Sequence, residues 1–98
     1  MDPSQTADLL ARAKAGSPDA VNLLYERAAA RLLAFIRLRL GRELRSRLES
    51  RDILQATLLK SYEKLGEFRG SEARSLMAWL ARIAEHQFRD SADQNLRQ

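Results

Sequence analysis

The 98-residue chain contains no cysteine and a single histidine. The absence of cysteine excludes disulfide bonds and cysteine-ligated zinc sites. With one histidine, His86, a histidine-ligated metal site is also disfavoured. The sequence therefore predicts neither a metal nor another cofactor.

Long hydrophobic runs are absent as well. The most apolar stretch, residues 28–40, is interrupted by Arg31, Arg37 and Arg39, which excludes a membrane-spanning helix there. The first five residues lack a basic start followed by an apolar run, so they do not form a secretory signal. We therefore expect a cytoplasmic protein with no membrane span.

Signals for β-strands are scarce, because the chain has one valine and no clean alternation of apolar and polar residues. Good helix formers (Ala, Leu, Arg, Glu and Gln) dominate instead. The length fits one small domain. These features predict an all-α fold, a small bundle of about four helices that occupies residues 1–98 as a single domain.

Glycine, proline and serine residues divide the chain into four expected helices, over residues 5–15, 18–40, 51–65 and from 71–75 onwards. Gly16 ends the first helix, Ser17 caps the second, and Pro18 opens it without losing a needed hydrogen bond. An Arg-rich connection is expected over residues 42–50. Apolar spacing predicts the following core: Leu9, Leu10, Ala13, Leu24, Ala28, Leu32, Phe35, Ile36, Ile53, Leu54, Thr57, Leu58, Tyr62, Leu65, Leu76, Met77, Leu80, Ile83, Ala84 and Phe88.

The charge balance is basic, with 17 Lys and Arg against 13 Asp and Glu, a formal net charge of +4 and a pI near 10.1. Of the 17 cationic residues 14 are Arg, whose planar fork suits phosphate better than Lys does. This balance indicates a nucleic-acid partner. The densest run is Arg37, Arg39, Arg42, Arg45, Arg47 and Arg51. On charge alone, a phosphate-facing patch and a solvated surface are equal alternatives for that run.

The last expected helix carries cations and an aromatic residue together. Arg82, His86 and Arg89 are spaced i, i+4 and i+7, so they line one face, with Trp79 just before them. Such a face suits a single strand or a duplex junction, where phosphates need charge and bases need a stacking platform. The alternative for Trp79 is a core position, and the neighbouring apolar pattern predicts that it is at least partly buried.

Signatures of catalysis are missing: there is no nucleophile elbow, no phosphate-binding glycine loop and no metal-ligand spacing. We therefore predict no catalytic residues and a non-enzymatic function.

Three ordered segments, residues 52–62, 68–70 and 78–84, resemble the N-terminal (region 2) domain of bacterial sigma factors of the extracytoplasmic-function group. The shared pattern is an Asp, two aliphatic residues and a Gln, then an apolar helix ending in an aromatic residue. A Phe-Arg turn and a Trp-Leu pair leading to Ile-Ala follow. The resemblance covers about residues 9–89 and lies in the ordered set and its spacing, since no single tetrapeptide is specific.

The resemblance implies that the third helix docks on the clamp helices of the largest RNA polymerase subunit. The implied contacts are Asp52, Gln55, Ala56 and Leu59. A carboxylate and an amide three residues apart share one helix face and can pair with Arg and polar groups of a partner helix. The family usually has an acidic residue where Ala56 stands, so one charge-assisted contact is expected to be missing.

The resemblance also implies that residues 69–75 capture a flipped base of the non-template strand of the promoter −10 element. Arg82 and Arg89 would hold its phosphates. The full set of implied DNA contacts is Arg69, Arg74, Ser75, Trp79, Arg82, His86 and Arg89. His86 stands where the family often has Asn, and Asp93 lies near a position where a basic residue is common.

Other readings stay open at this point. One alternative is a helical protein–protein interaction module, or a regulator, that does not touch DNA. A duplex-reading helix-turn-helix protein is disfavoured, because the link over residues 66–71 exceeds the usual turn of about three to four residues. Complete factors of this group carry a second domain that reads the −35 element, and residues 1–98 do not include that domain. The chain is therefore expected to be either a fragment of a longer factor or a reduced member of the group. An anti-sigma factor is a further candidate partner.

Overall fold

The computed structural model describes residues 3–40, 47–70 and 72–97. Its elements are α1 (Pro3–Lys14), α2 (Pro18–Leu40), α3 (Arg47–Glu63), a 3-10 turn η1 (Leu65–Glu67) and α4 (Ala73–Arg97). No strand occurs within these ranges. The predicted all-α bundle of four helices is confirmed.

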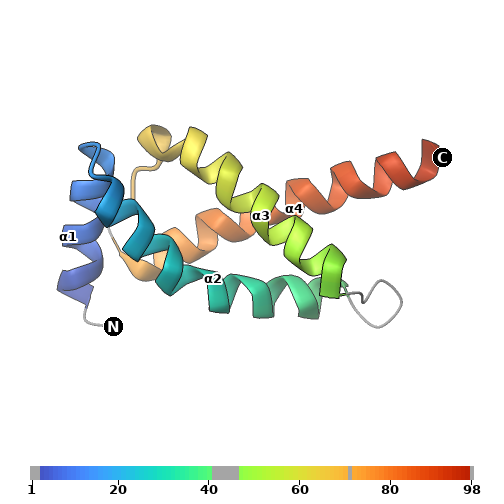
Figure 1. Ribbon diagram of the computed structural model, residues 1–98, viewed down its shortest axis with the longest axis horizontal. Coiled ribbons are helices and arrows are strands. Elements are labelled where there is room, and N and C mark those ends of the chain that lie inside the picture. Colours follow the sequence, from blue (N-terminus) through green and yellow to red (C-terminus); the bar gives the residue numbers. More distant parts are fainter. Residues whose placement is uncertain (1–2, 41–46, 71, 98) are drawn as a thin grey trace.

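The helices form an elongated bundle with extents of 43 × 23 × 19 Å. As Figure 1 shows, α1 packs against the first turns of α2 at one end of the molecule, and α3 crosses over α4 near the centre. α2 runs along α3 and α4 and contacts every other helix. The last turns of α4 extend beyond the other helices (Figure 1). Within the described residues, no helix is both long enough and apolar enough to cross a membrane.

The turn between α1 and α2 follows the local sequence signals. Gly16 has a φ of 101°, which a residue with a side chain rarely adopts, and the N–H of Ser17 donates to the carbonyl of Arg12 at 3.0 Å. The Ser17 hydroxyl then accepts a hydrogen bond from the N–H of Ala20 at 3.3 Å. Pro18 is the first residue of α2. The predicted end of one helix and start of the next are therefore confirmed.

One core joins all four helices. In α2 the buried side chains recur every three or four residues, and Leu32 and Ile36 are completely shielded from solvent. The apolar residues of the shared core are Leu9, Leu10, Ala13, Ala20, Val21, Leu24, Ala28, Leu32, Ile36, Ile53, Leu65, Phe68, Leu76, Leu80 and Ala84. Most of the core predicted from apolar spacing is thus confirmed, with Phe35, Leu54, Leu58, Met77 and Phe88 packed at its margin.

The buried face of α3 is built mainly from hydroxyl residues. Ser50, Thr57 and Ser61 are each at most 1 % exposed. The Thr57 hydroxyl donates to the carbonyl of Ile53 at 2.6 Å, so a polar group is buried without loss of its hydrogen bond. Tyr62 was predicted to belong to this buried face, but it is 59 % exposed, and that prediction is wrong.

The third helix also begins earlier than expected. α3 starts at Arg47, inside the stretch predicted as a connection, and the chain turns through η1 before α4. α4 begins at Ala73, where the N–H of Leu76 donates to the carbonyl of Glu72, within the predicted interval. Residues 41–46 lie outside the described residues.

Candidate nucleic-acid interface

Five residues of α4 lie along one side of that helix. They are three or four positions apart, which places them one above the other on a helix surface. The set, called the α4 stripe below, is Ser75, Trp79, Arg82, His86 and Arg89. Arg82, His86 and Arg89 are exposed, whereas Ser75 and Trp79 are half-buried. The sequence-based expectation that cations and an aromatic residue share one face of this helix is confirmed.

Trp79 is shared between the core and the surface. Its ring lies 5.0 Å from the ring of Phe68, measured between centroids, at an interplanar angle of 33°. Phe68 itself is 5 % exposed, so it forms the inner layer of the pair. Trp79 keeps a partly exposed surface, as predicted.

The segment that precedes α4 is held close to Phe68 and Ser75. A Cβ added to Gly70 would lie 2.5 Å from Cζ of Phe68 and 2.7 Å from Cβ of Ser75. No ordinary side chain therefore fits at Gly70 without moving one of them. From the other side, the Lys14 ammonium group donates to the backbone carbonyl of Phe68. These contacts fix the base of the 69–75 segment.

The charged side chains of the 69–75 segment point outward. Arg69 is exposed, and Arg74 is 91 % exposed. Arg74 lies 3.5 Å from the carboxylate of Glu72, which is itself exposed. An ion pair in that setting is weak, so it leaves Arg74 free to exchange its partner. Ser71 lies outside the described residues.

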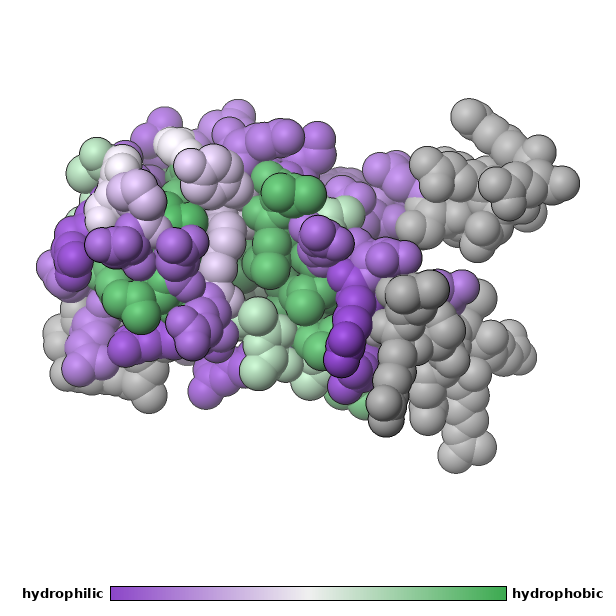
Figure 2. Space-filling view, viewed as in Figure 1, coloured by the Kyte–Doolittle hydropathy of each residue, from purple (hydrophilic) through white to green (hydrophobic). Residues whose placement is uncertain are grey.

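A second set of predicted residues lies on α3. Asp52, Gln55 and Leu59 are exposed and Ala56 is half-buried; their helical spacing puts them on the side of α3 opposite to its buried hydroxyl groups. Leu59 is 62 % exposed, and Tyr62 extends the same side. This set of five is called the α3 face below. Figure 2 shows a band of hydrophobic residues that runs from the middle of α3 down to α2, with hydrophilic residues on either side.

The sequence model of the sigma-70 region 2 family matches residues 24–98, which is most of the chain. The chain belongs to the sigma-70 region 2 family. No curated protein sequence and no solved structure matches it. Region 2 domains act in promoter recognition with RNA polymerase and promoter DNA, and the family is a transcription-factor domain rather than an enzyme.

Both surfaces described above lie within the part of the chain that matches region 2, whereas α1 precedes it. All the predicted contact residues reach the surface at least in part. The exposed residues are Asp52, Gln55, Leu59, Arg69, Arg74, Arg82, His86 and Arg89, and the half-buried residues are Ala56, Ser75 and Trp79. The structure therefore separates them into two groups, one on α3 and one on α4 with the segment before it.

Arg82 and Arg89 of the α4 stripe have no acidic partner within ion-pair distance among the described side chains. Two exposed guanidinium groups on one side of a region 2 helix give that side a positive potential, which attracts phosphate. The side chain of Asp93, expected to weaken such a contact, lies outside the described residues.

One residue of the Arg-rich run, Arg39, makes contacts within the fold. Arg39 makes two hydrogen bonds to the carboxylate of Glu85 on α4, at 2.8 and 3.3 Å, and its guanidinium lies 5.8 Å from the ring centre of Phe88. Arg39 therefore ties α2 to α4 rather than facing a phosphate. Arg37 and Arg51 are exposed. Three members of the run lie outside the described side chains: Arg42, Arg45 and Arg47.

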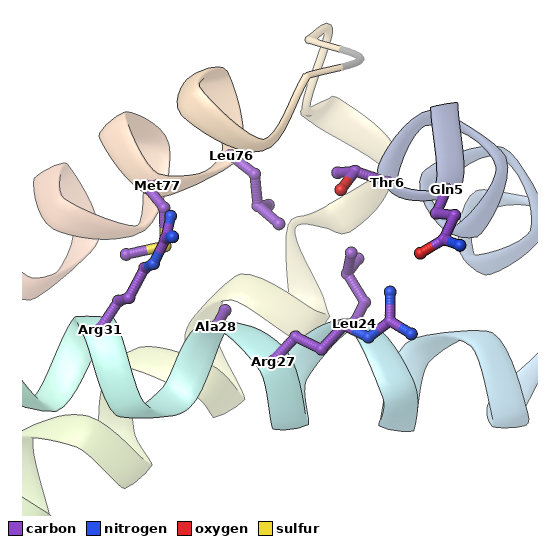
Figure 3. Close-up of a pocket in the computed structure, with 8 residues that line it drawn as sticks. All are labelled: Gln5, Thr6, Leu24, Arg27, Ala28, Arg31, Leu76 and Met77. Atoms are coloured by element: carbon purple, nitrogen blue, oxygen red, sulfur yellow. The ribbon is translucent and has the colours of Figure 1, made fainter. Parts of the chain in front are cut away.

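Sequence reasoning missed an open hollow of about 440 Å³ between α1, α2 and α4. Its lining includes Gln5, Arg27, Arg31 and Met77, and Figure 3 shows the Arg31 side chain extending towards Met77. Arg27 and Arg31 are exposed and give the hollow a positive rim. No sequence signal marked them, because they stand apart from both the Arg-rich run and the α4 pattern. Among the described residues, no group of three or more acidic, His or Cys side chains could hold a metal ion.

Proposed function

We propose that this region 2 domain belongs to a sigma factor of the extracytoplasmic-function group. In this proposal α3 docks on the clamp helices of the largest polymerase subunit, and α4 helps to melt the promoter −10 element by holding its non-template strand. Residues 1–98 act as one domain, which the core shared by all four helices supports. Because bacterial transcription takes place in the cytoplasm, we place the protein there.

The observation that carries the DNA half of the proposal is the α4 stripe. Single-stranded DNA offers phosphates on one side and flat bases on the other, and proteins that hold it combine cations with an aromatic platform. Arg82 and Arg89 supply the cations, and the exposed part of Trp79 supplies the platform. Because Trp79 is braced by Phe68 behind it, the platform is rigid before DNA arrives.

Melting requires that a base leave the stack, which costs a few kcal/mol. We assign its capture to the 69–75 segment, where Arg69 and Arg74 are exposed beside the half-buried Ser75. The hydroxyl of Ser75 and the two guanidinium groups offer hydrogen-bond donors to base edges. His86 stands further along the stripe, where it is positioned to contact a neighbouring nucleotide.

The docking half of the proposal depends on the α3 face. Leu59 and Tyr62 are 62 % and 59 % exposed, so both keep apolar surface that a partner could bury. Asp52 and Gln55 flank them with groups that accept hydrogen bonds from Arg. An apolar centre with a polar rim is the usual composition of a protein interface. Here the centre compensates for the acidic residue that Ala56 replaces.

The same exposed face of α3 is where an anti-sigma factor would prevent docking, and we propose it as the surface such a partner covers. Blocking Leu59 and Tyr62 would keep the domain from polymerase without touching the α4 stripe.

The DNA half is tested by selecting a preferred strand from single-stranded oligonucleotides with a randomised −10 segment, using the chain bound to core polymerase. Arg82→Ala is then compared with Arg12→Ala, which removes an exposed arginine that pairs with Asp8 on α1. Loss of one phosphate contact lowers the salt slope by roughly 0.7, which corresponds to about five-fold weaker binding near 0.1 M salt. We expect this loss for Arg82→Ala and none for Arg12→Ala.

Equal affinities of these two variants for the selected strand would contradict the role of Arg82. If the wild-type complex retains no strand even at low salt, where phosphate attraction is greatest, the chain is a helical interaction module that does not touch DNA.

The docking half is tested by measuring the affinity of the chain for core polymerase. Leu59→Ala is compared with Leu38→Ala, since Leu38 is also exposed but belongs to α2. A buried leucine at an interface contributes about 1.5–3 kcal/mol, so Leu59→Ala should weaken docking at least ten-fold. Leu38→Ala should bind like the wild type, and Asp52→Ala should weaken docking less than Leu59→Ala does. Equal affinity of both leucine variants would argue against α3 as the docking helix.

A further inference from the structure

Lys14, the last residue of α1, contacts Phe68 in two ways although the two residues are 54 positions apart. Its ammonium group donates to the Phe68 carbonyl, and it also lies 5.7 Å from the centre of the Phe68 ring. A cation in that position is attracted both by the carbonyl dipole and by the negative face of the ring. The contact therefore fixes the backbone and the side chain of Phe68 together.

Phe68 in turn sets the geometry of the 69–75 segment. Its ring supports Trp79 at 5.0 Å, and its edge occupies the space that a side chain at Gly70 would need. Ser75 closes the other side of that space. A shift of Phe68 would thus move both the start of the segment and the aromatic platform of the α4 stripe.

Lys14 is held in place by its own helix. Leu9, Leu10 and Ala13 of α1 are buried in the core, and Gly16 ends the helix just after Lys14. The ammonium group is therefore delivered from an anchored helix end rather than from a mobile tail. α1 also precedes residues 24–98, the part of the chain matched by region 2, so this contact comes from outside the matched domain.

We propose that Lys14 is a positioning residue for base capture, through which α1 sets the conformation of the 69–75 segment. The inference rests on the proposed function, because it assumes that this segment receives the flipped base. Lys14 acts through Phe68 and touches no DNA itself. It therefore affects discrimination between bases more than overall attraction to phosphate.

The test uses the full chain bound to core polymerase. Its affinity is measured for the oligonucleotide selected by the wild type and for the same oligonucleotide with an abasic site at the flipped position. The variants are Lys14→Met, which removes the charge, and Lys14→Arg, which keeps a cation. Lys64→Met is the matched control, because it removes an exposed cation just after α3 whose side chain makes no hydrogen bond, ion pair or ring contact within the described part of the chain. Acrylamide quenching of Trp79, the single tryptophan, reports on the segment in the free chain.

We expect Lys14→Met to increase the quenching of Trp79. It should also lower the ratio of the affinities for the intact and the abasic strand by about two- to five-fold, which is the equivalent of one cation–π contact at an exposed site. Lys14→Arg should restore both values, and Lys64→Met should change neither. Affinity for the abasic strand should fall no further in Lys14→Met than in Lys64→Met.

The inference is overturned if Lys14→Met matches Lys64→Met in both quenching and affinity ratio. It is also overturned if quenching rises while the ratio stays at the wild-type value, since the contact would then be structural only. Failure of the proposed function looks different: the wild type itself would then bind the intact and the abasic strand equally.

Discussion

Gly70 offers the sharpest test of how the segment before α4 is packed. Replacing it with alanine adds one methyl group at a point where Cζ of Phe68 lies 2.5 Å and Cβ of Ser75 lies 2.7 Å away. Neither atom is the loose end of a flexible side chain. The Phe68 ring is 5 % exposed and packed against Trp79, and Cβ of Ser75 is fixed to the backbone of α4.

The magnitude follows from these distances. Carbon atoms in good contact are about 3.5–4.0 Å apart, so the ring or the first turn of α4 has to move by about 1 Å. Overpacking of this kind costs about 1–3 kcal/mol. Gly→Ala also restricts the unfolded chain, which stabilises the protein by about 0.4–1 kcal/mol where the new side chain fits.

Gly66 is the matched control, because a Cβ there would have no neighbour within 4 Å. Both variants share the effect on the unfolded chain, so their difference isolates the clash. With a urea dependence of about 1 kcal/mol per molar for a small domain, Gly70→Ala should unfold at a urea concentration about 1–3 M below that of Gly66→Ala. Urea unfolding followed by Trp79 fluorescence and by circular dichroism measures both midpoints. Equal midpoints would show that the segment is not packed as described.

Arg39 and Tyr25 lie away from the proposed DNA surface and allow two further predictions. Arg39→Ala should leave affinity for the selected strand unchanged and lower the free energy of unfolding by at most about 1 kcal/mol, because the side chains of Arg39 and Glu85 are 57 % and 34 % exposed and the ion pair is partly screened by solvent. A loss of strand affinity would show that Arg39 contacts phosphate after all. Burial raises the pKa of Tyr25, the hydrogen bond between Tyr25 and Ser61 opposes this rise, and Tyr62 adds to it. The stability that this neutral phenol contributes is present below the unfolded pKa of about 10 and is lost as pH rises through the folded pKa. Between about pH 8 and about pH 11 the urea midpoint of unfolding should therefore fall further in the wild type than in Tyr25→Phe. An equal fall in both proteins would exclude Tyr25 as the cause.

The parts of the fold that follow local rules could be predicted from the sequence. The turn at Gly16 and Ser17 needs only a residue that tolerates a positive φ and a hydroxyl that accepts a backbone hydrogen bond. The α4 stripe is equally local, since helical spacing alone places Arg82, His86 and Arg89 on one face. For the same reason most of the buried positions of α2 were predictable.

The orientation of α3 could not be predicted in the same way. Apolar residues occur on several sides of this helix, so apolarity did not mark the buried side, and Tyr62 was assigned to the core. The structure buries Ser61 instead, beside Thr57, whose burial was predicted. Each of these hydroxyls donates a hydrogen bond to a carbonyl of its own helix and is small enough for close packing. The Ser61 oxygen also lies 2.8 Å from the Tyr25 hydroxyl of α2, a partner 36 positions away.

Long-range contacts account for the rest of what the sequence could not indicate. Arg39 belongs to a run of arginines, and only the crossing of α2 and α4 brings it to Glu85, 46 positions later. Lys14 is likewise unremarkable in the sequence until the fold carries it to Phe68. In both cases a cationic side chain could either stay in solvent or make a contact within the fold, and the tertiary structure decides between these two.

The two surfaces of this region 2 domain depend on different forces, and this difference bears on the order in which they act. The α3 face presents Leu59 and Tyr62, whose burial is driven by the hydrophobic effect and depends little on salt. The α4 stripe presents Arg82 and Arg89, whose attraction to phosphate falls steeply as salt rises. At the ionic strength of a cell the proposed docking of α3 therefore keeps its strength while α4 binds a free strand weakly. In this proposal the stripe gains its effective affinity once the docking of α3 holds it beside the promoter, because the second contact is then intramolecular. In the proposed function, a domain arranged in this way reads the −10 element as part of polymerase and not alone.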